Sequence, residues 1–391
     1  MTLALEGIRI LDLCQMAPGA FCTMILGDLG AEVVTIVPPN SMYHAGAAEG
    51  EENKWEVYNA HTRNKKSLVL NLRDEDARQV LHRLMTKSDV IVEGFRPGVA
   101  KRLGVDYETV KKINSRIIYC SMSGFGQDGP YNQLPGHDIN YISLAGVLGI
   151  IGEPDGAPII PSNLIADFGG ASLHAAIGIL AALMARARTG QGQYVDIAYL
   201  DSAISLQTLE ASLYFATGML PKRGKTWLTG VAPFYNTYKT KDGKYISIGC
   251  VEPHFWQNLC QELGKADFIP YQFAEEKYDE IFSFFRKTFL TKNRDEWFKL
   301  LSGKNIPITP VYDIDEVFTD PQVIHRQMLV EIDHPVFGRV KQAGVPIKLS
   351  YTPGQVRSLG TNPGAHADEI LMGLGYGREE IEKFRKSGAL G

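Results

Sequence analysis

The sequence of 391 residues lacks the short motifs that identify several large classes of enzyme. It contains no H-E-x-x-H zinc motif, no G-x-S-x-G nucleophile motif and no G-x-x-x-x-G-K-[ST] phosphate loop. No G-x-G-x-x-G follows the first predicted strand. Metalloprotease, serine-hydrolase, nucleoside-triphosphatase and NAD-dependent functions are therefore disfavoured.

Cysteine is scarce in this chain and does not occur in pairs. The five cysteines form no C-x-x-C motif, and their number is odd. A disulfide framework or a structural zinc site is therefore not expected, and a reducing compartment fits the composition.

An excess of positive charge and long apolar runs are also missing. The formal net charge is −4, whereas proteins that bind nucleic acid or anionic membranes usually carry a basic excess. The longest apolar runs, near Ile139–Ile151 and Ala175–Ala185, are shorter than the about 18 residues that a span requires. Charges within Met1–Asp12 are untypical of a signal peptide, and the C-terminal Gly-Ala-Leu-Gly is no targeting address. We expect a cytoplasmic protein with neither nucleic acid nor membrane as a partner.

The N-terminal part of the chain alternates short β-rich runs with amphipathic stretches, which predicts an α/β layer fold. The predicted strands are Ile8–Leu13, Glu32–Val37, Ser67–Leu72, Val90–Glu93, Ile117–Ser121, Gln193–Asp196, Tyr235–Thr240, Lys244–Cys250 and, near the C-terminus, Val345–Leu349. The predicted helices are Ala20–Leu29, Asp74–Met85, Lys101–Leu103, Tyr107–Ile113, Gly169–Ala187, Ala198–Thr217 and Arg378–Ser387. Because Gly169–Ala187 is small and apolar at nearly every position, we expect that helix to be buried.

A change in amino-acid composition along the chain predicts two domains. Gly218–Gly230 has the Pro, Lys, Arg and Gly content of a linker. We predict a large, doubly wound, Rossmann-like α/β domain from residues 1–217 and 330–391, a linker at 218–230 and a smaller α+β domain at 231–329.

Two short motifs contain candidate proton-transfer residues, His137 and Asp167. The motifs are Gly136-His137-Asp138-Ile139-Asn140-Tyr141 and Asn163-Leu164-Ile165-Ala166-Asp167-Phe168-Gly169-Gly170. A histidine and a carboxylate over one pocket can remove a proton from one face of a carbon and return one to the other. A single histidine is more often a surface or core residue, and Asp167 also suits an N-cap of the helix that follows. Backbone donors at such a helix start would suit an enolate oxygen, so both interpretations of Asp167 can hold.

Glu252 and a set of basic residues are weaker candidates. Glu252 precedes a proline, where a solvated carboxylate is the simpler interpretation. A glutamate paired with a catalytic imidazole would, however, orient the ring and raise its basicity. The basic residues of the first domain could bind the phosphates of a polyanionic ligand, and the candidates are Arg63, Lys65, Lys66, Arg73, Arg96, Lys101 and Arg102.

These motifs, in this order and with their flanking sequence, resemble the α-methylacyl-CoA racemases of the class III (CaiB/BaiF-type) CoA-transferase superfamily. The resemblance covers essentially the whole chain and includes Ala17-Pro18-Gly19, Asp28-Leu29-Gly30-Ala31, Gly94-Phe95-Arg96-Pro97-Gly98, Ser123-Gly124-Phe125-Gly126, Gly249–Pro253 and Leu374-Gly375-Tyr376. Several of these are shared with the transferases. The Gly136–Tyr141 motif is the one that resembles the racemase branch, in which the histidine is a catalytic base.

The resemblance implies roles for individual residues. The two bases would be His137 and Asp167, with Glu252 supporting the histidine. Contacts to CoA would come from Leu70, Asn71, Leu72, Arg73, Gly94, Phe95, Arg96, Arg102, Gly136, Asp138, Ile139, Asn140 and Tyr141. The family fold implies an interlocked homodimer in which the small domain of one chain covers the site of its partner. The implied substrate is a CoA thioester with a 2-methyl-branched acyl group, and no metal or redox cofactor is required.

Two departures from the family pattern stand out. Racemases commonly place arginines after the second strand, where this chain has Thr35 and Pro38, and the usual Gly-Glu-His near the C-terminus is Gly364-Ala365-His366. The first departure removes a candidate CoA contact. Two alternatives therefore stay open beside the racemase: a CoA-transferase in which Asp167 is a carboxylate nucleophile, and a non-catalytic acyl-CoA binder.

Overall fold

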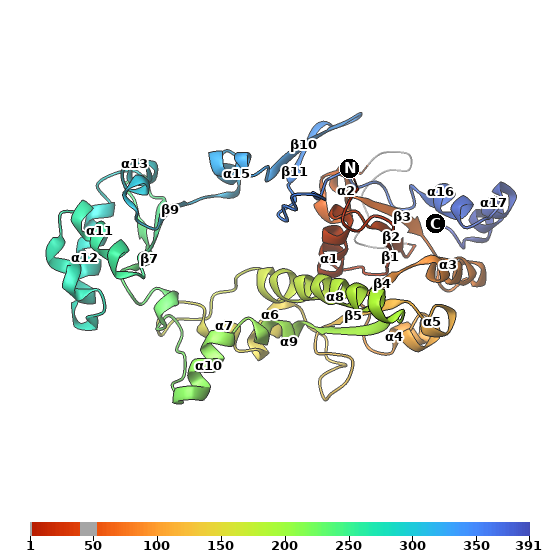
Figure 1. The fold of residues 1–391 in the computed structure, drawn as a ribbon, viewed down its shortest axis with the longest axis horizontal. Coiled ribbons are helices and arrows are strands. Elements are labelled where there is room, and N and C mark those ends of the chain that lie inside the picture. The colour runs from red at the N-terminus through yellow and green to blue at the C-terminus, as the bar shows by residue number, and fades with distance from the viewer. Residues whose placement is uncertain (1, 40–52) are drawn as a thin grey trace. The chain divides into compact units, whose positions relative to one another are not determined.

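The computed structural model describes residues 2–39 and 53–391, which divide into two compact units (Figure 1). Unit 1 comprises Met1–Ala145, Pro161–Leu206 and Pro321–Gly391, and unit 2 comprises Gly146–Ile160 and Gln207–Asp320. These bounds differ from the predicted ones at 217 and 330, and unit 2 also takes a segment from within the predicted large domain. One cause is local: the predicted helix Ala198–Thr217 is two helices, α9 (Tyr199–Ser205) and α10 (Thr208–Thr217), and the boundary falls at the break between them.

Unit 1 is built on a parallel six-stranded sheet with the strand order β3-β2-β1-β4-β5-β6. Its strands are β1 (Arg9–Asp12), β2 (Glu32–Val37), β3 (Lys65–Val69), β4 (Val90–Glu93), β5 (Ile118–Ser123) and β6 (Gln193–Ala198). The order reverses between β1 and β4, and a doubly wound sheet binds its ligands beyond the carboxyl ends of the strands at such a switch point. The predicted α/β class with a parallel sheet is confirmed.

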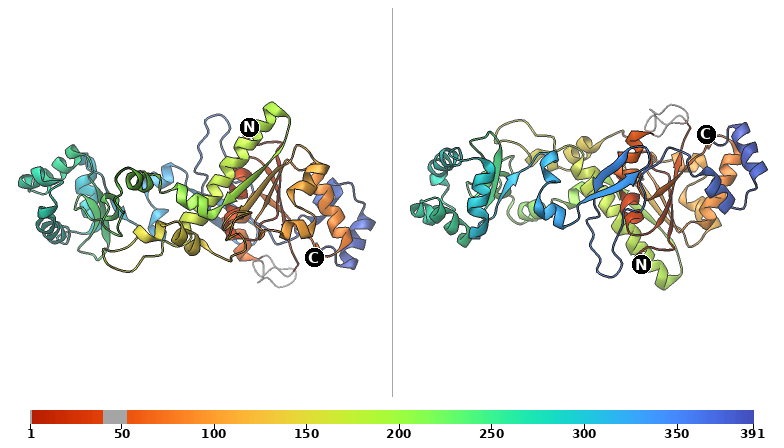
Figure 2. Two further views of the ribbon diagram at one scale, coloured as in Figure 1. Left: turned by 90° about the horizontal axis from the view of Figure 1, so that it is seen from below. Right: turned by 90° about the horizontal axis from the view of Figure 1, so that it is seen from above.

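Helices cover both faces of this sheet because successive strand residues point to opposite faces. On one face Leu11 and Ile91 pack with α3 (Glu75–Lys87), α16 (Ala367–Gly373) and α17 (Arg378–Ser387). On the other face, Ile10, Val90 and Val92 pack with α1 (Ala17–Asp28) and α8 (Leu173–Thr189). The two C-terminal helices therefore complete a core that the N-terminal strands begin. Both views in Figure 2 show these helices, in blue, beside helices of the N-terminal part of the chain.

The apolar helix α8 is preceded without a break by a π-helical segment, η3 (Leu164–Ser172). The predicted burial of this helix is only half correct. One side packs on the sheet, whereas Ile177 and Met184 are 62% and 68% exposed. The joined segment Leu164–Thr189 has 26 residues, and its most apolar 18-residue window has a mean hydropathy of 1.7 and is 39% buried. By length and composition alone it could cross a bilayer, a test that a core helix also passes.

Unit 2 contains a three-stranded antiparallel sheet, β7 (Tyr235–Lys239), β8 (Tyr245–Gly249) and β9 (Ile308–Val311). The two strands predicted at Tyr235–Thr240 and Lys244–Cys250 are thus confirmed, and they form a hairpin. An aromatic core that includes Phe234, Trp256 and Phe285 joins the sheet to α11 (Pro253–Glu262), α12 (Tyr278–Phe289) and α13 (Arg294–Leu301).

The remaining α-helices and strands are short. They are α2 (Lys54–Tyr58), α4 (Val99–Leu103), α5 (Tyr107–Ile113), α6 (Asp138–Leu144), α7 (Val147–Ile150), α14 (Ile314–Val317), α15 (Pro321–His325) and the hairpin β10 (Leu329–His334) with β11 (Gly338–Ala343). The predicted strand at Val345–Leu349 is wrong: these residues are irregular, since Pro346 has no N–H to give to a ladder.

Candidate functional site

His137 and Asp167 line the same cavity in unit 1, which has a volume of about 510 Å³. The two residues come from different elements, because His137 directly precedes α6 and Asp167 lies in η3. Six of the predicted CoA-contact residues line this cavity with them: Gly94, Phe95, Arg96, Gly136, Asn140 and Tyr141. The structure therefore brings the two candidate bases together, and we call this space the base cavity.

Backbone hydrogen bonds hold His137 at the start of α6. The side-chain Oδ1 of Asn140 accepts the backbone N–H of His137 at 3.0 Å, and the Asn140 N–H donates to the His137 carbonyl at 2.8 Å. The hydroxyl of Tyr141 donates to the carbonyl of Gly136 at 2.5 Å. A Cβ at Gly136 would lie 2.7 Å from the Tyr141 ring, so only glycine allows this packing. The His137 side chain is thus left exposed on a fixed backbone.

The carboxyl group of Asp167 is partly buried, and its ionisation is shifted. Burial raises the pKa of Asp167 from 3.8 to about 6; the Asn163 side-chain hydrogen bond and the proximity of His137 lower it, and the charge of Asp138 raises it. The Asn163 amide donates to Asp167 Oδ2 at 3.3 Å. A carboxyl group with a pKa near neutrality can both accept and return a proton under cellular conditions.

The N-cap interpretation of Asp167 is wrong, because Asp167 lies inside η3 and its own N–H is the group that needs an acceptor. Asp138 provides that acceptor. Its Oδ2 accepts the N–H groups of Ala166 at 2.7 Å and of Asp167 at 2.9 Å. Asp138 is only 3% exposed and anchors this segment, while its predicted contact with CoA stays a prediction. This role depends on two segments distant in sequence, and no local pattern indicates it.

A second cavity, of about 500 Å³, lies beside the predicted CoA-binding segment after β3. Leu70, Asn71, Leu72 and Arg73 line it together with Phe95, and we call it the Arg73 cavity. Pro38, at the position of the missing arginine, lines it as well. Arg102 on α4 and Ile139 on α6 are exposed and lie outside the linings of both cavities, so their contact with CoA stays a prediction.

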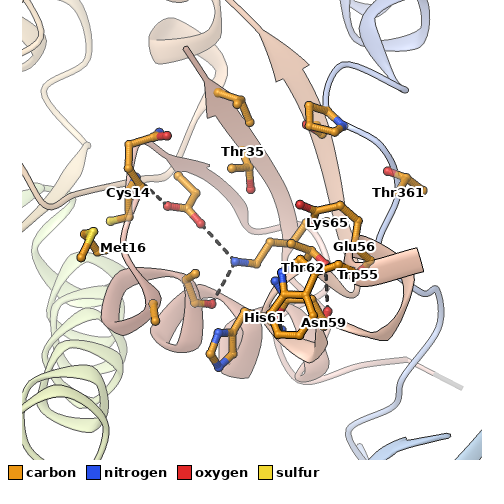
Figure 3. Close-up of a pocket in the computed structure, with 17 residues that line it drawn as sticks. Cys14, Met16, Thr35, Trp55, Glu56, Asn59, His61, Thr62, Lys65 and Thr361 are labelled. Carbon is orange, nitrogen blue, oxygen red and sulfur yellow. Dashed lines mark hydrogen bonds and ion pairs between the residues drawn. The ribbon is translucent and has the colours of Figure 1, made fainter. Parts of the chain in front are cut away.

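A third cavity, of about 340 Å³, was not predicted from the sequence (Figure 3). Thr35 lines it together with Asp12, His61 and Lys65, and we call it the Thr35 cavity. The available signal was Asp12 at the end of an apolar strand. In the structure the buried Lys65 ammonium contacts the Asp12 carboxylate at 3.1 Å.

All three cavities reach the carboxyl ends of parallel strands. Their linings include residues at or just after the ends of β1, β2 and β4, among them Asp12, Val37 and Gly94. This is the edge at which a doubly wound sheet places its ligands. The fold therefore supports one extended binding region at the β1–β4 switch point.

Glu252 belongs to unit 2, where it is exposed and directly precedes the first helical residue, Pro253, of α11. Its predicted pairing with His137 stays a prediction.

Within residues 2–39 and 53–391, no group of three or more His, Cys, Asp or Glu is placed to hold a metal ion.

Comparison with known proteins assigns nearly the full length of the chain to the superfamily that its motifs resemble. Residues 5–367 match CoA-transferase family III. The chain is 38% identical over 388 residues to human alpha-methylacyl-CoA racemase, covering 97% of this chain and 95% of that protein. It is 31% identical over 402 residues to mouse succinyl-CoA:glutarate CoA-transferase, covering 99% and 90%. A CaiB/BaiF family protein of Brucella suis has a TM-score of 0.84 at 29% identity, covering 96% of this chain and 100% of that one. The chain therefore belongs to CoA-transferase family III, a family of enzymes that act on CoA thioesters.

Proposed function

We propose that this protein is a racemase or epimerase of 2-methyl-branched acyl-CoA thioesters. The observation that carries the proposal is the pairing of His137 and Asp167 in one cavity. The human racemase, at 38% identity over 97% of the chain, supports the same activity.

In the proposed reaction the thioester carbonyl acidifies the hydrogen on the neighbouring carbon. One base removes that proton, a planar enolate forms, and the other base returns a proton to the opposite face. Asp167, with its pKa raised to about 6, is largely ionised at neutral pH and so suits proton removal. Once protonated it is an acid strong enough to give the proton back.

We expect polar donors near Asp167 to stabilise the enolate oxygen. Donors that point at developing negative charge commonly supply the largest share of catalysis.

The nucleotide of CoA fits the Arg73 cavity, since Phe95 lines both that cavity and the base cavity. A bound CoA could therefore pass from Arg73 to the two bases along one wall. We expect weaker binding of its phosphates than in a homologue with an arginine at the position of Pro38, which lines the Arg73 cavity. No metal or redox cofactor is needed for this reaction.

We further propose an interlocked homodimer in which Glu252 of one subunit supports His137 of the other. Exposed apolar side chains support a partner surface: α10 contains no buried residue, and Leu209 and Phe215 on it are 65% and 81% exposed. Sedimentation of an active, stable monomer would overturn the dimer.

A CoA-transferase remains the second candidate, supported by transferase relatives such as the mouse protein at 31% identity. In that reaction the Asp167 carboxylate would attack the thioester carbonyl, displace CoA thiolate and form a mixed anhydride. The thiolate would attack the Asp167 carbonyl, which releases the donor acid and leaves an aspartyl-CoA thioester. The acceptor carboxylate would displace the thiolate to form a second mixed anhydride, and the thiolate would then attack the acceptor carbonyl, giving the new acyl-CoA and free Asp167. His137 would have only a structural role.

One incubation separates the candidates. The protein is mixed with a 2-methylacyl-CoA in deuterated water, with and without a free carboxylic acid. Deuterium at the α-carbon and inverted configuration are expected for the racemase. Transfer of CoA to the free acid without deuterium would establish the transferase instead, and neither product would leave an acyl-CoA binder.

A further inference from the structure

The Thr35 cavity adjoins both cavities that the proposed reaction uses. Gln15 lines both the Thr35 cavity and the Arg73 cavity, and Met16 lines both the Thr35 cavity and the base cavity. Phe95 lines both the Arg73 cavity and the base cavity. The three spaces therefore meet around the turn that follows β1, and each touches the other two.

An acyl-CoA also has three parts, joined in a row: the nucleotide with its pantetheine arm, the thioester and the acyl chain. In the proposed function the nucleotide lies in the Arg73 cavity and the thioester lies in the base cavity. We propose that the Thr35 cavity holds the acyl end and favours acyl groups that carry an uncharged polar group, such as a hydroxyl. This inference rests on the proposed function and defines its substrate class.

Two buried oxygens in this region have no hydrogen-bond partner in the described part of the chain. They are Thr35 Oγ1 and Gln15 Oε1, and both residues line the Thr35 cavity. The Gln15 side chain is held in place, because its Nε2 donates to the Ile36 carbonyl at 3.0 Å. Buried polar atoms are nearly always hydrogen-bonded, so an unpaired pair beside a cavity indicates a ligand group that completes them.

The charges around the cavity argue against a carboxylate-ended acyl group. Of the described lining residues, Lys65 is the only Lys or Arg, and its ammonium is already bound (Figure 3). It contacts Asp12 Oδ2 at 3.1 Å, the Ala20 carbonyl at 2.9 Å and Thr23 Oγ1 at 2.7 Å. Asp12 and Glu56 add carboxyl groups to the lining. A terminal carboxylate would therefore lose its water without gaining a free cation.

His61 also lines the Thr35 cavity, and it adds no positive charge there. Its ring is half-buried beside Phe21 and Phe168, with centroids 5.8 Å and 5.5 Å away. Burial lowers the pKa of His61 to about 4, and the nearby cations Lys65 and Arg63 lower it further in the same direction. The imidazole is therefore neutral at physiological pH and offers one donor and one acceptor rather than a positive charge.

The test compares three CoA thioesters with the same 2-methyl-branched chain length, ending in a methyl group, a hydroxyl group or a carboxylate. The rate of α-deuterium incorporation gives kcat/KM for each. We expect the hydroxyl substrate to be preferred over the methyl one by about tenfold, the scale of one added hydrogen bond. The carboxylate substrate should be the slowest. A preference for the carboxylate or for the methyl end would overturn the inference.

Two substitutions at Thr35 locate the selectivity. Thr35→Val keeps the shape and removes the hydroxyl, so the hydroxyl-over-methyl ratio should fall by about tenfold. Thr35→Ser keeps the hydroxyl and should retain the ratio. Thr86→Val, on the exposed side of α3, is a matched control that should leave the ratio unchanged. A Thr35→Val protein with the wild-type ratio would overturn the role of this cavity. If no thioester incorporates deuterium, the proposed function itself has failed.

Discussion

The side-chain carboxylate of Asp138 accepts the backbone N–H of Asp167 at 2.9 Å, so the neighbour of one candidate base positions the other. The same oxygen accepts the Ala166 N–H. Asp138 therefore ties the start of α6 to η3, the two elements that bring His137 and Asp167 into one cavity.

Replacing Asp138 should impair catalysis by moving Asp167. In Asp138→Ala, two buried N–H groups lose their acceptor, at a cost of about 1–3 kcal/mol each. We expect kcat for α-proton exchange to fall by 10-fold or more with a smaller change in KM. Steady-state kinetics on folded protein measure this. An unchanged kcat would contradict the anchoring role.

Asp138→Asn separates charge from geometry. An amide oxygen can still accept the N–H groups, whereas the negative charge that raises the pKa of Asp167 is lost. The acid limb of the kcat/KM profile should therefore move to lower pH. A limb that stays in place or moves to higher pH would show that Asp167 does not set it.

Loss of either base should abolish racemisation in both directions. We expect His137→Ala and Asp167→Asn each to lower the rate by about 10²–10⁴-fold. Each variant can still exchange deuterium into substrate of one configuration, because removal and return on one face need only one base. Chiral analysis with mass spectrometry measures both. Near-normal racemisation by folded His137→Ala would rule out the two-base mechanism.

The raised pKa of Asp167 also predicts how the free energy of unfolding depends on pH. The folded protein holds this proton more tightly than the unfolded chain, with a pKa of about 6 against 3.8. The contribution of Asp167 therefore favours the folded state most at low pH and is lost as pH rises to about 6. Asp167→Asn lacks this loss, so it should gain stability relative to wild type between about pH 4 and pH 7. Urea unfolding across that range, with exposed Asp315→Asn as control, tests the trend. A constant difference would contradict it.

Restoring a cation beside the Arg73 cavity should strengthen CoA binding. Pro38 lines this cavity, and Arg73 is the only charged side chain among its described lining residues. We expect Pro38→Arg to lower KM for an acyl-CoA several-fold at low salt, with less effect at high salt. A dephospho-CoA thioester, which lacks the ribose phosphate, should gain less. Equal gains for both substrates would place the new contact elsewhere on the nucleotide.

Sequence alone was sufficient where the signal was local. The β-branched runs Glu32–Val37 and Val90–Glu93 became β2 and β4 with the predicted bounds, and Arg378–Ser387 became α17. Each has a hydrophobic pattern that is complete within a few residues. The Gly136–Tyr141 motif likewise led to the family by resemblance, which the comparisons confirmed.

Tertiary structure decided the features that depend on distant segments. Burial of Asp167 sets its pKa, and the acceptor for its N–H comes from Asp138, 29 positions earlier. The Thr35 cavity gathers residues from β1, β2, β3 and the chain near Thr361. Desolvation and hydrogen bonding act between groups that are close in space, and only the packed chain shows which groups those are.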